Sequence, residues 1–435
     1  MGKIKKHAIQ YVFIILSITS LLFVGVKGPL LYNDSNAYFG MWPYVSAGYP
    51  FFLRSLHVVF GDMYPMAAVT LQYIAVIVSI YVFVTKFLTL FKLQTYQYIL
   101  ILLLLFYPVF DSNVYMITNI STEGLCFALF LQVIHLSYRV LFLHDVKLLL
   151  LLWLFMIVLV SIRGQFQFLV PVFIAIELVR FFMTKKWSFK HLIVLFTIPL
   201  AVFVVDNVYH KLIQKQYFST PFVWTAFVTS ILFVADDADV EFLDTENQKE
   251  VFKLVKAKFK EKGVDNKSHK YYEEPIDYNY FFYHYELPTL CNQTVQQDVL
   301  NYYLEGQPRD TEHIVAAYLK LERTHKELFF QLFPHVFQKW SALTFQNFKT
   351  GIGGVSIAIA YIFALVILLM YYAKTHQTLL LWMSCLLVVL LLNRVVVSVS
   401  VHGLTRYFFY TDWITVFLLF LGVNMYRQKL NASEQ

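Results

Sequence analysis

The sequence contains little cysteine and little charge. Three cysteines in 435 residues provide no disulfide framework, and none stands in a Cys/His spacing typical of a metal site. Charged residues make up 14% of the chain and hydrophobic residues 58%, a balance that excludes an ordinary soluble domain. The chain also lacks a Walker loop, a GxSxG elbow and an HExxH motif. The common chemistries of soluble enzymes are therefore not indicated.

Long apolar runs are abundant instead. A helix needs roughly 20 apolar residues to cross a bilayer, and it must be a helix because an unpaired backbone amide is energetically costly in hydrocarbon. Counting such runs predicts an all-α integral membrane protein with about ten transmembrane helices. The expected spans are 8–27, 66–90, 98–110, 121–143, 148–162, 166–183, 191–208, 351–372, 378–401 and 407–426.

Lysine and arginine near the span ends predict the orientation. With the N-terminus inside, every short cytoplasmic loop is basic, whereas the short outer turns carry far fewer basic residues. Both termini are therefore expected in the cytoplasm. The net charge of +7 follows from these loops, so we expect no nucleic-acid partner.

Two polar segments, 28–65 and 209–350, interrupt the spans. Of the 28 acidic residues, 19 lie between Asp236 and Glu327, so the longer segment must be solvated. The expected division is a seven-span module (1–208, with outer loop 28–65), an extracytoplasmic helical domain (209–350) and a three-span module (351–435).

Four features are expected within 209–350. A capping box at Thr245 and Gln248 predicts a helix that ends near Gly263. Two more helices are expected, over 294–305 and over 311–340, and the latter is expected to break at Pro334 and to lie on the membrane surface by a Phe-rich face. The apolar run 222–235 is short for a span and is interpreted as interfacial or re-entrant.

Polar residues recur at the predicted outer ends of the spans. They are Asp34 after the first span, Gly48-Tyr49-Pro50 at the start of a surface helix, Ser121-Thr122-Glu123 at the start of the fourth span, Arg163 after the fifth and Arg406-Tyr407 at the last. Their order resembles the GT-C superfamily, polytopic membrane glycosyltransferases that take a sugar from a polyprenyl-phosphate donor. The resemblance implies a GT-C-like fold and an inverting sugar transfer at the extracytoplasmic face.

The resemblance also implies roles for the acids. Asp34 is the candidate general base, since a carboxylate must reach the acceptor hydroxyl on the side opposite the leaving phosphate. Glu123 and Asp111 are further candidate catalytic acids. An acid in the first turn of a helix is equally what the helix dipole favours, so a capping role stays open for Glu123. A turn role stays open for Asp34.

Cationic and aromatic candidates complete the expected site. Guanidinium groups stabilise the charge that grows on a leaving phosphate, and the candidates are Arg163, Arg394 and Arg406. Arg394 lies inside a predicted span, where a charge is costly unless it is paired or lines a cavity. The expected contacts to acceptor or lipid are Tyr38, Tyr49, His402 and Tyr407.

Some members of the superfamily carry a second acid two residues after the first and bind a divalent metal. Here Asn36 stands at that position, so we expect no metal, with Mg²⁺ or Mn²⁺ dependence as the alternative. The expected partners are a polyprenyl-phosphate sugar donor, a lipid, glycan or protein acceptor, and membrane lipids. The expected location is a bacterial inner (plasma) membrane.

Two other functions remain open at this point. An O-antigen polymerase or ligase also has ten or more spans and one large outer loop, in which it uses Arg or His. The loop here contains His269, His284, His313, His325 and His335. A transporter of lipid-linked sugar is the other alternative. Such transporters commonly show inverted repeats and broken spans, which this sequence does not clearly show.

Overall fold

The computed structural model describes residues 3–31, 34–112, 114–185, 188–264, 281–401 and 405–433. These residues form helices joined by loops, and they contain no β-strand beyond an isolated bridge between Leu30 and Asn119. The first nine helices are α1 (Lys3–Lys27), α2 (Ser35–Phe39), α3 (Gly48–Phe60), α4 (Tyr64–Val82), α5 (Thr95–Phe110), α6 (Glu123–Ser137), α7 (Leu149–Ile162), α8 (Leu169–Thr184) and α9 (Phe189–Gln214). The others are α10 (Val223–Val234), α11 (Glu246–Glu261), α13 (Leu287–Thr289), α14 (Val299–Leu304), α15 (Thr311–Ile352), α16 (Val355–Thr375), α17 (Thr378–Val399) and α18 (Thr405–Ser433).

Among the described residues, eight helical stretches are long and apolar enough to cross a membrane. The chain is therefore an all-α integral membrane protein. Each of the ten predicted spans overlaps a helix, but two of those helices, Thr95–Phe110 and Val146–Ile162, are shorter than the eight. They also fall short of the roughly 20 residues that a straight crossing requires.

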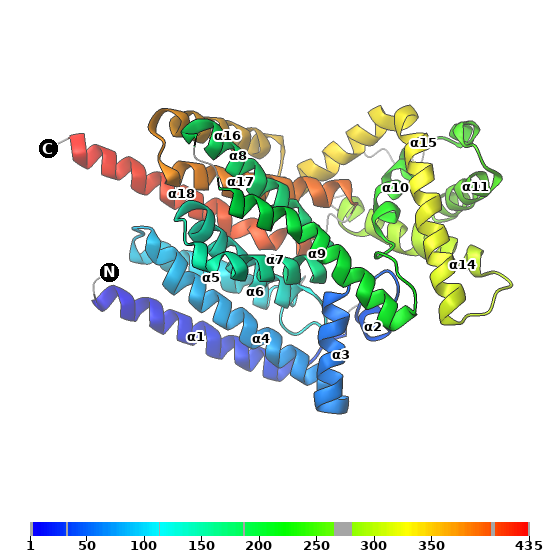
Figure 1. The fold of residues 1–435 in the computed structure, drawn as a ribbon, viewed down its shortest axis with the longest axis horizontal. Helices are drawn as coiled ribbons and strands as arrows, with labels where there is room; N and C mark the ends of the chain where they lie inside the picture. The colour runs from blue at the N-terminus through cyan, green and yellow to red at the C-terminus, as the bar shows by residue number, and fades with distance from the viewer. Residues whose placement is uncertain are drawn as a thin grey trace.

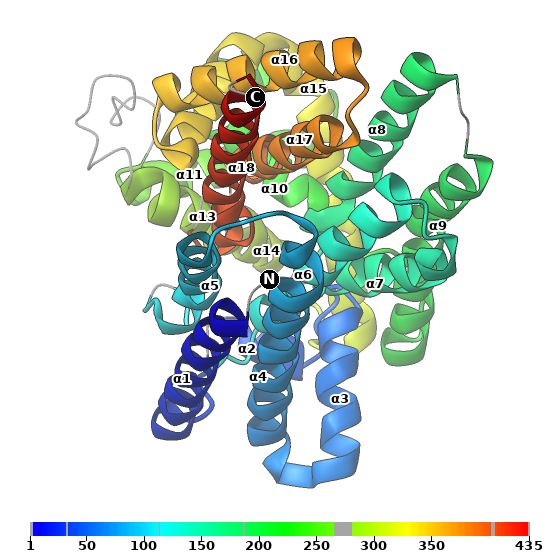
Figure 2. The same cartoon turned by 90° about the vertical axis from the view of Figure 1, so that its left-hand side faces the viewer.

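One large apolar core holds the membrane helices together. Helices α6 and α17 lie inside it, since 78% and 72% of their most apolar stretches are buried, against 17% for α1 and 11% for α16. In a bilayer the exposed faces of α1 and α16 would meet lipid. Figure 2 shows α3 and α4 as a hairpin at one edge of this bundle.

A second apolar core is built around α10, α11 and α15. Helix α10 was predicted to be interfacial or re-entrant, but nearly all its residues from Thr225 to Val234 are buried. It is the inner helix of this core. The predicted capping box is confirmed, because the Thr245 hydroxyl accepts from the Gln248 amide and α11 follows.

Helix α15 corrects a second expectation. It does not end at Pro334 but continues to Ile352 with the proline inside it, and Figure 1 shows it bent. A proline inside a helix removes one backbone hydrogen bond and bends the axis. The bent helix therefore links the second core to α16, one of the membrane helices.

The two cores occupy opposite parts of the molecule. Figure 1 shows both chain ends at one end of the bundle and the second core beyond the other end, near α2 and α3. Helix α9 runs on to Gln214, six residues past the predicted end of its span at residue 208. Its last residue donates to the carbonyl of Met41 at 2.6 Å, which ties α9 to the loop after α2.

Candidate active site

Backbone contacts bring the segment before α2 beside the segment before α6. The Leu30 amide donates to the Thr118 carbonyl and the Ile120 amide donates to the Leu30 carbonyl, both at 2.9 Å. The buried Ser35 hydroxyl then donates to the Ile120 carbonyl at 2.8 Å. Asp34, which precedes Ser35, is thereby held close to the start of α6.

Arg163 lies between α7 and α8 in an extended conformation, with φ −149° and ψ 108°. Its two terminal nitrogens reach different helices. Nη2 pairs with Oε1 of Glu123 at 3.1 Å, and Nη1 donates to the Tyr410 hydroxyl at 2.7 Å. The guanidinium also lies 4.2 Å from the centre of the Tyr407 ring, so Arg163 connects α6 to α18.

Arg406, near the start of α18, lies between both acids. Its Nη1 is 2.9 Å from Oδ2 of Asp34 and 3.7 Å from Oε1 of Glu123. The Tyr407 ring, 5.2 Å from this guanidinium, contacts both arginines. We call Asp34, Glu123, Arg163 and Arg406 the ion-pair network; its formal charges cancel.

The network has a closed end and an open end. The Glu123 side chain is 2% exposed, whereas that of Asp34 is 36% exposed. A charge that stays in place at 2% exposure needs partners, because burial alone disfavours the charged form. The carboxylate of Asp34 is therefore the acid of the network that an incoming molecule can reach.

Tyr38 lies near Asp34 and Glu123, and Tyr49 lies next to Tyr38. Their rings meet at 5.0 Å in an edge-on contact, and burial together with the negative charge of Asp34 and Glu123 raises the pKa of Tyr38 well above its usual value. The Tyr38 hydroxyl thus keeps its proton. Tyr49 is fully buried and its hydroxyl donates to Oε1 of Gln72 at 2.6 Å.

The prediction that Tyr49 contacts an acceptor or lipid does not fit this position. A hydroxyl without exposed surface that already donates to Gln72 supports the framework. Gln72 in turn donates to the carbonyls of Ile117 and Asn119 at 3.1 and 3.0 Å. This chain of bonds fixes the segment that precedes Glu123.

Arg394 lies apart from the network. It pairs with Asp412 and its guanidinium is 4.3 Å from the centre of the Phe408 ring. At 100° per residue, Phe408 and Asp412 project from the side of α18 opposite Arg406. From the sequence we expected Arg394 to lie with Arg163 and Arg406. The structure instead places it apart from them.

Asp111 is not part of the network either. Asp111 is the residue after α5, where its backbone carbonyl accepts from the amides of Val114 and Tyr115. The Tyr107 hydroxyl lies near both Asp111 and Asp412, which places Asp111 on the Arg394 side. His402 lies outside the described residues.

Several residues of the site were missed from the sequence. Tyr410 lies one helical turn after Arg406, so the i, i+4 rule could have found it. Gln165 donates to Oδ1 of Asn393 at 2.6 Å and to the Tyr407 carbonyl at 3.1 Å, which joins α17 and α18 beside Arg163. An amide side chain inside the apolar run of α17 was the available signal for Asn393.

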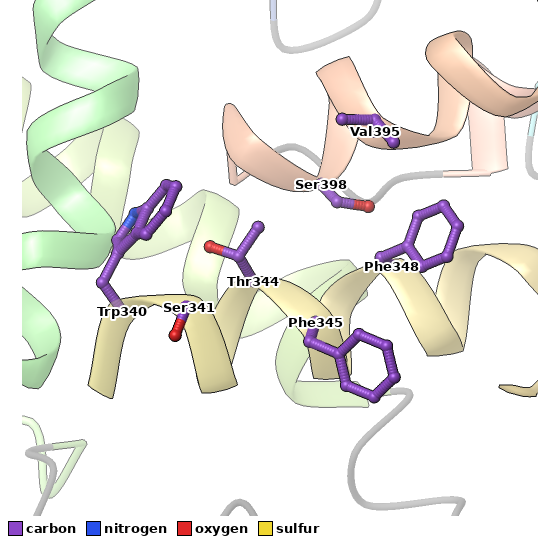
Figure 3. A pocket seen from close by; sticks show the side chains of 7 residues that line it. All are labelled: Trp340, Ser341, Thr344, Phe345, Phe348, Val395 and Ser398. Atoms are coloured by element: carbon purple, nitrogen blue, oxygen red, sulfur yellow. The ribbon is translucent and has the colours of Figure 1, made fainter. Parts of the chain in front are cut away.

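An apolar cavity of about 240 Å³ lies between α15 and α17. Figure 3 shows Thr344 and Phe348 pointing toward Val395 and Ser398 of α17, while Phe345 points away. Ser398 lies one turn after Arg394 and its hydroxyl donates to the Arg394 carbonyl at 2.7 Å. The apolar lining suits a hydrocarbon chain better than a sugar.

Each acid of the network already has a positively charged partner. Within the described ranges, no group of three or more His, Cys, Asp or Glu side chains could hold one. Asp34 and Glu123 are each paired with a guanidinium, which supplies the positive charge that a metal would bring. Asn36 adds no carboxylate.

No family model matches the chain, and neither a curated protein nor a solved structure does.

Proposed function

We propose that the chain transfers a sugar from a polyprenyl-phosphate donor to an acceptor hydroxyl, with inversion, and that Asp34 is the general base. The observation that carries this proposal is the ion pair of a partly exposed Asp34 with Arg406, together with Glu123 and Arg163. A base with one open side and guanidinium groups beside it suits a reaction that deprotonates a hydroxyl and releases a phosphate.

The chemical step balances within these groups. Asp34 takes the acceptor proton, the acceptor oxygen forms a bond to the anomeric carbon, and the bond from that carbon to the phosphate oxygen breaks. Its electron pair stays on the phosphate, which leaves on the polyprenyl chain. Oδ2 of Asp34 faces Arg406, so Oδ1 is the oxygen that would accept the proton.

The same geometry supplies stabilisation at the moment it is needed. When Asp34 becomes neutral, Arg406 loses part of its counter-charge just as charge grows on the leaving phosphate. An interaction that strengthens only in the transition state raises the rate rather than ground-state binding. Arg163 stays paired with Glu123 and Tyr410 and would hold the arrangement in place.

Two further observations support a lipid-linked donor. Helix α2, which follows Asp34, lies at the end of the membrane bundle that faces the second core (Figure 1), and the cavity between α15 and α17 is apolar enough for an isoprenoid chain. Two of the five histidines that favour the alternative, a polymerase, have other contacts: His325 is fully buried against the Thr225 hydroxyl, and His335 stacks on Phe242 at 3.6 Å. His269 lies outside the described residues.

The test is transfer from a panel of radiolabelled polyprenyl-phosphate sugars by the purified chain in nanodiscs. Asp34→Asn should lower turnover by about 10²–10⁴-fold, the usual contribution of a general base. Asp62→Asn, an exposed acid after α3, is the matched control and should keep wild-type turnover. Because guanidinium groups occupy both acids, EDTA should leave the rate unchanged.

Wild-type turnover in a correctly folded Asp34→Asn protein would remove Asp34 from the mechanism. Thermal unfolding of both variants separates that result from a folding defect. If both EDTA and the Asp34→Asn substitution abolished transfer, Asp34 would remain the general base, but the reaction would require a metal ion.

A further inference from the structure

A second cavity, of about 150 Å³, opens beside the network. Tyr38 and Phe39 of α2 line one side, and Leu53, Arg54 and His57 of α3 line the other. Pockets for drug-sized ligands measure roughly 300–1,000 Å³. This one is large enough for a headgroup but not for a whole sugar-lipid molecule.

Arg54 is the charged residue of this cavity. Its side chain is exposed and has no ion pair or hydrogen bond within the described part of the chain. Asp62, at the turn of the same hairpin, also lacks an ion pair among the described residues. Arg54 thus has no carboxylate partner among the described residues and lies at the rim of a pocket lined by aromatic rings. Such an arginine is suited to bind a phosphate, because its planar guanidinium can donate two parallel hydrogen bonds to it.

The outer surface of α3 indicates where such a phosphate comes from. Phe51 is 66% exposed, and Val58 and Val59 are 74% and 72% exposed. Figure 2 shows α3 at the edge of the membrane bundle, so this apolar face can lie against lipid chains. A ligand with its phosphate at Arg54 and its hydrocarbon along α3 would satisfy both surfaces.

Tyr38 connects the cavity to the candidate base. Tyr38 is part of the cavity wall, and its amide donates to the Asp34 carbonyl at 3.2 Å. The charges of Asp34 and Glu123 also act on its hydroxyl. A hydroxyl carried near the phosphate of a bound lipid would therefore approach Asp34.

We propose that the cavity between α2 and α3 binds the phosphate headgroup of an anionic phospholipid through Arg54, and that this lipid is the sugar acceptor. The binding site stands by itself on the cavity, the apolar face and a guanidinium that has no ion pair among the described residues. The acceptor role rests on the proposed glycosyl transfer.

Native mass spectrometry of the full chain in detergent tests the site without any activity. The probes are phosphatidylglycerol, which is anionic and carries free hydroxyls, and phosphatidylcholine. Phosphatidylglycerol should bind at least about tenfold more tightly, and Arg54→Gln should weaken it about tenfold or more, the usual effect of losing a hydrogen bond to a charged group. Arg54→Lys should fall between, because it keeps the charge and loses the fork.

Arg309→Gln, which removes another exposed arginine, is the charge-matched control and should bind like the wild type. Equal binding by Arg54→Gln and the wild type would overturn the site. Glycerol 3-phosphate supplies the same phosphate without chains; displacement of the lipid by an equal concentration of it would overturn the lipid assignment in favour of a soluble phosphate.

The acceptor role has a separate readout. In the transfer assay with phosphatidylglycerol as acceptor, Arg54→Gln should raise the acceptor KM about tenfold with little change in kcat, since it removes binding and not chemistry. Tight, Arg54-dependent lipid binding by a wild type that transfers no sugar would uphold the site and overturn the acceptor role together with the proposed function.

Discussion

Glu123 and Glu322 are two glutamates withdrawn from water in the two cores of the molecule, and they are accommodated differently. Glu123 lies at the end of the membrane bundle between two guanidinium groups. Glu322, in the second core, accepts the backbone amide of Trp224 at 3.0 Å at the start of α10. Burial raises the pKa of Glu322 to about 7.

The difference shows which acid the structure keeps charged. A helix N-terminus offers only about half a positive charge, which leaves Glu322 close to protonation at neutral pH. The guanidinium groups around Glu123 carry full charges that themselves need a counter-charge. The bundle therefore stabilises the charged form of Glu123. In Glu322 the charged form is destabilised by burial, and binding a proton removes that free-energy cost.

The largest effect is expected on removing the Glu123 charge. Glu123→Gln leaves Arg163 and Arg406 with one carboxylate between them, and breaking a buried ion pair costs about 3–5 kcal/mol. Denaturant unfolding of the purified chain in detergent measures this loss. Lys260→Gln is the control: the side chains of Lys260 and Asp237 are 48% and 49% exposed, so their ion pair should contribute at most about 1 kcal/mol. Equal losses in the two variants would show that burial does not distinguish the two ion pairs.

The second prediction concerns the pH dependence of Glu322. Its folded pKa of about 7 lies above the usual 4.5, so between these values the folded protein holds a proton that the unfolded chain has lost. This contribution is present below pH 4.5 and disappears as the pH rises to about 7. The difference of about 2.5 pKa units corresponds to something on the order of 3 kcal/mol.

Glu322→Gln should remove that slope and make the protein more stable than the wild type at pH 8. Thermal unfolding between pH 4.5 and 8 measures it, with Glu312→Gln, an exposed glutamate of the same helix, as the control that keeps the wild-type slope. If the Glu322→Gln and wild-type curves run parallel, Glu322 ionises like an exposed acid and the contrast with Glu123 fails.

The positions of the helices followed from the sequence to a large extent, because apolar runs and capping residues are local signals. All ten predicted spans overlap helices, and α11 begins at its predicted cap. Helix α10 was misassigned because the sequence of a short apolar helix does not show whether the helix lies at a membrane surface or in a protein interior. The break at Pro334 was wrong because neighbouring packing can hold a bent helix together.

The network was only partly foreseeable. Asp34, Glu123, Arg163 and Arg406 were named from their order along the chain and do meet, yet their roles stay predictions. Arg394 was grouped with them because the sequence does not show toward which side of α17 it projects. That direction depends on how α17 is rotated against α18, which is settled by packing between residues far apart in sequence, such as Gln165 with Asn393.

The smallest effect is expected at Gly48, where α3 approaches the end of α7 beside Arg163. A Cβ atom there would lie 2.7 Å from the Ile162 amide nitrogen and 2.8 Å from the Ser161 carbonyl carbon, and backbone atoms cannot rotate away. Gly48→Ala should therefore cost about 1–3 kcal/mol, the usual penalty of overpacking. Because the displaced backbone leads directly into Arg163, transfer should fall more than stability alone explains.

Gly25→Ala in α1 is the matched control, since a Cβ there meets nothing within 4 Å. That change should leave stability unchanged or raise it by up to about 1 kcal/mol, because alanine loses less backbone entropy than glycine in a helix. Denaturant unfolding of the two variants side by side measures the difference. A Gly48→Ala protein as stable as Gly25→Ala would mean that α3 and α7 can separate at no cost, and the ion pairs of Glu123 would then hold Arg163 in place without support from the backbone packing.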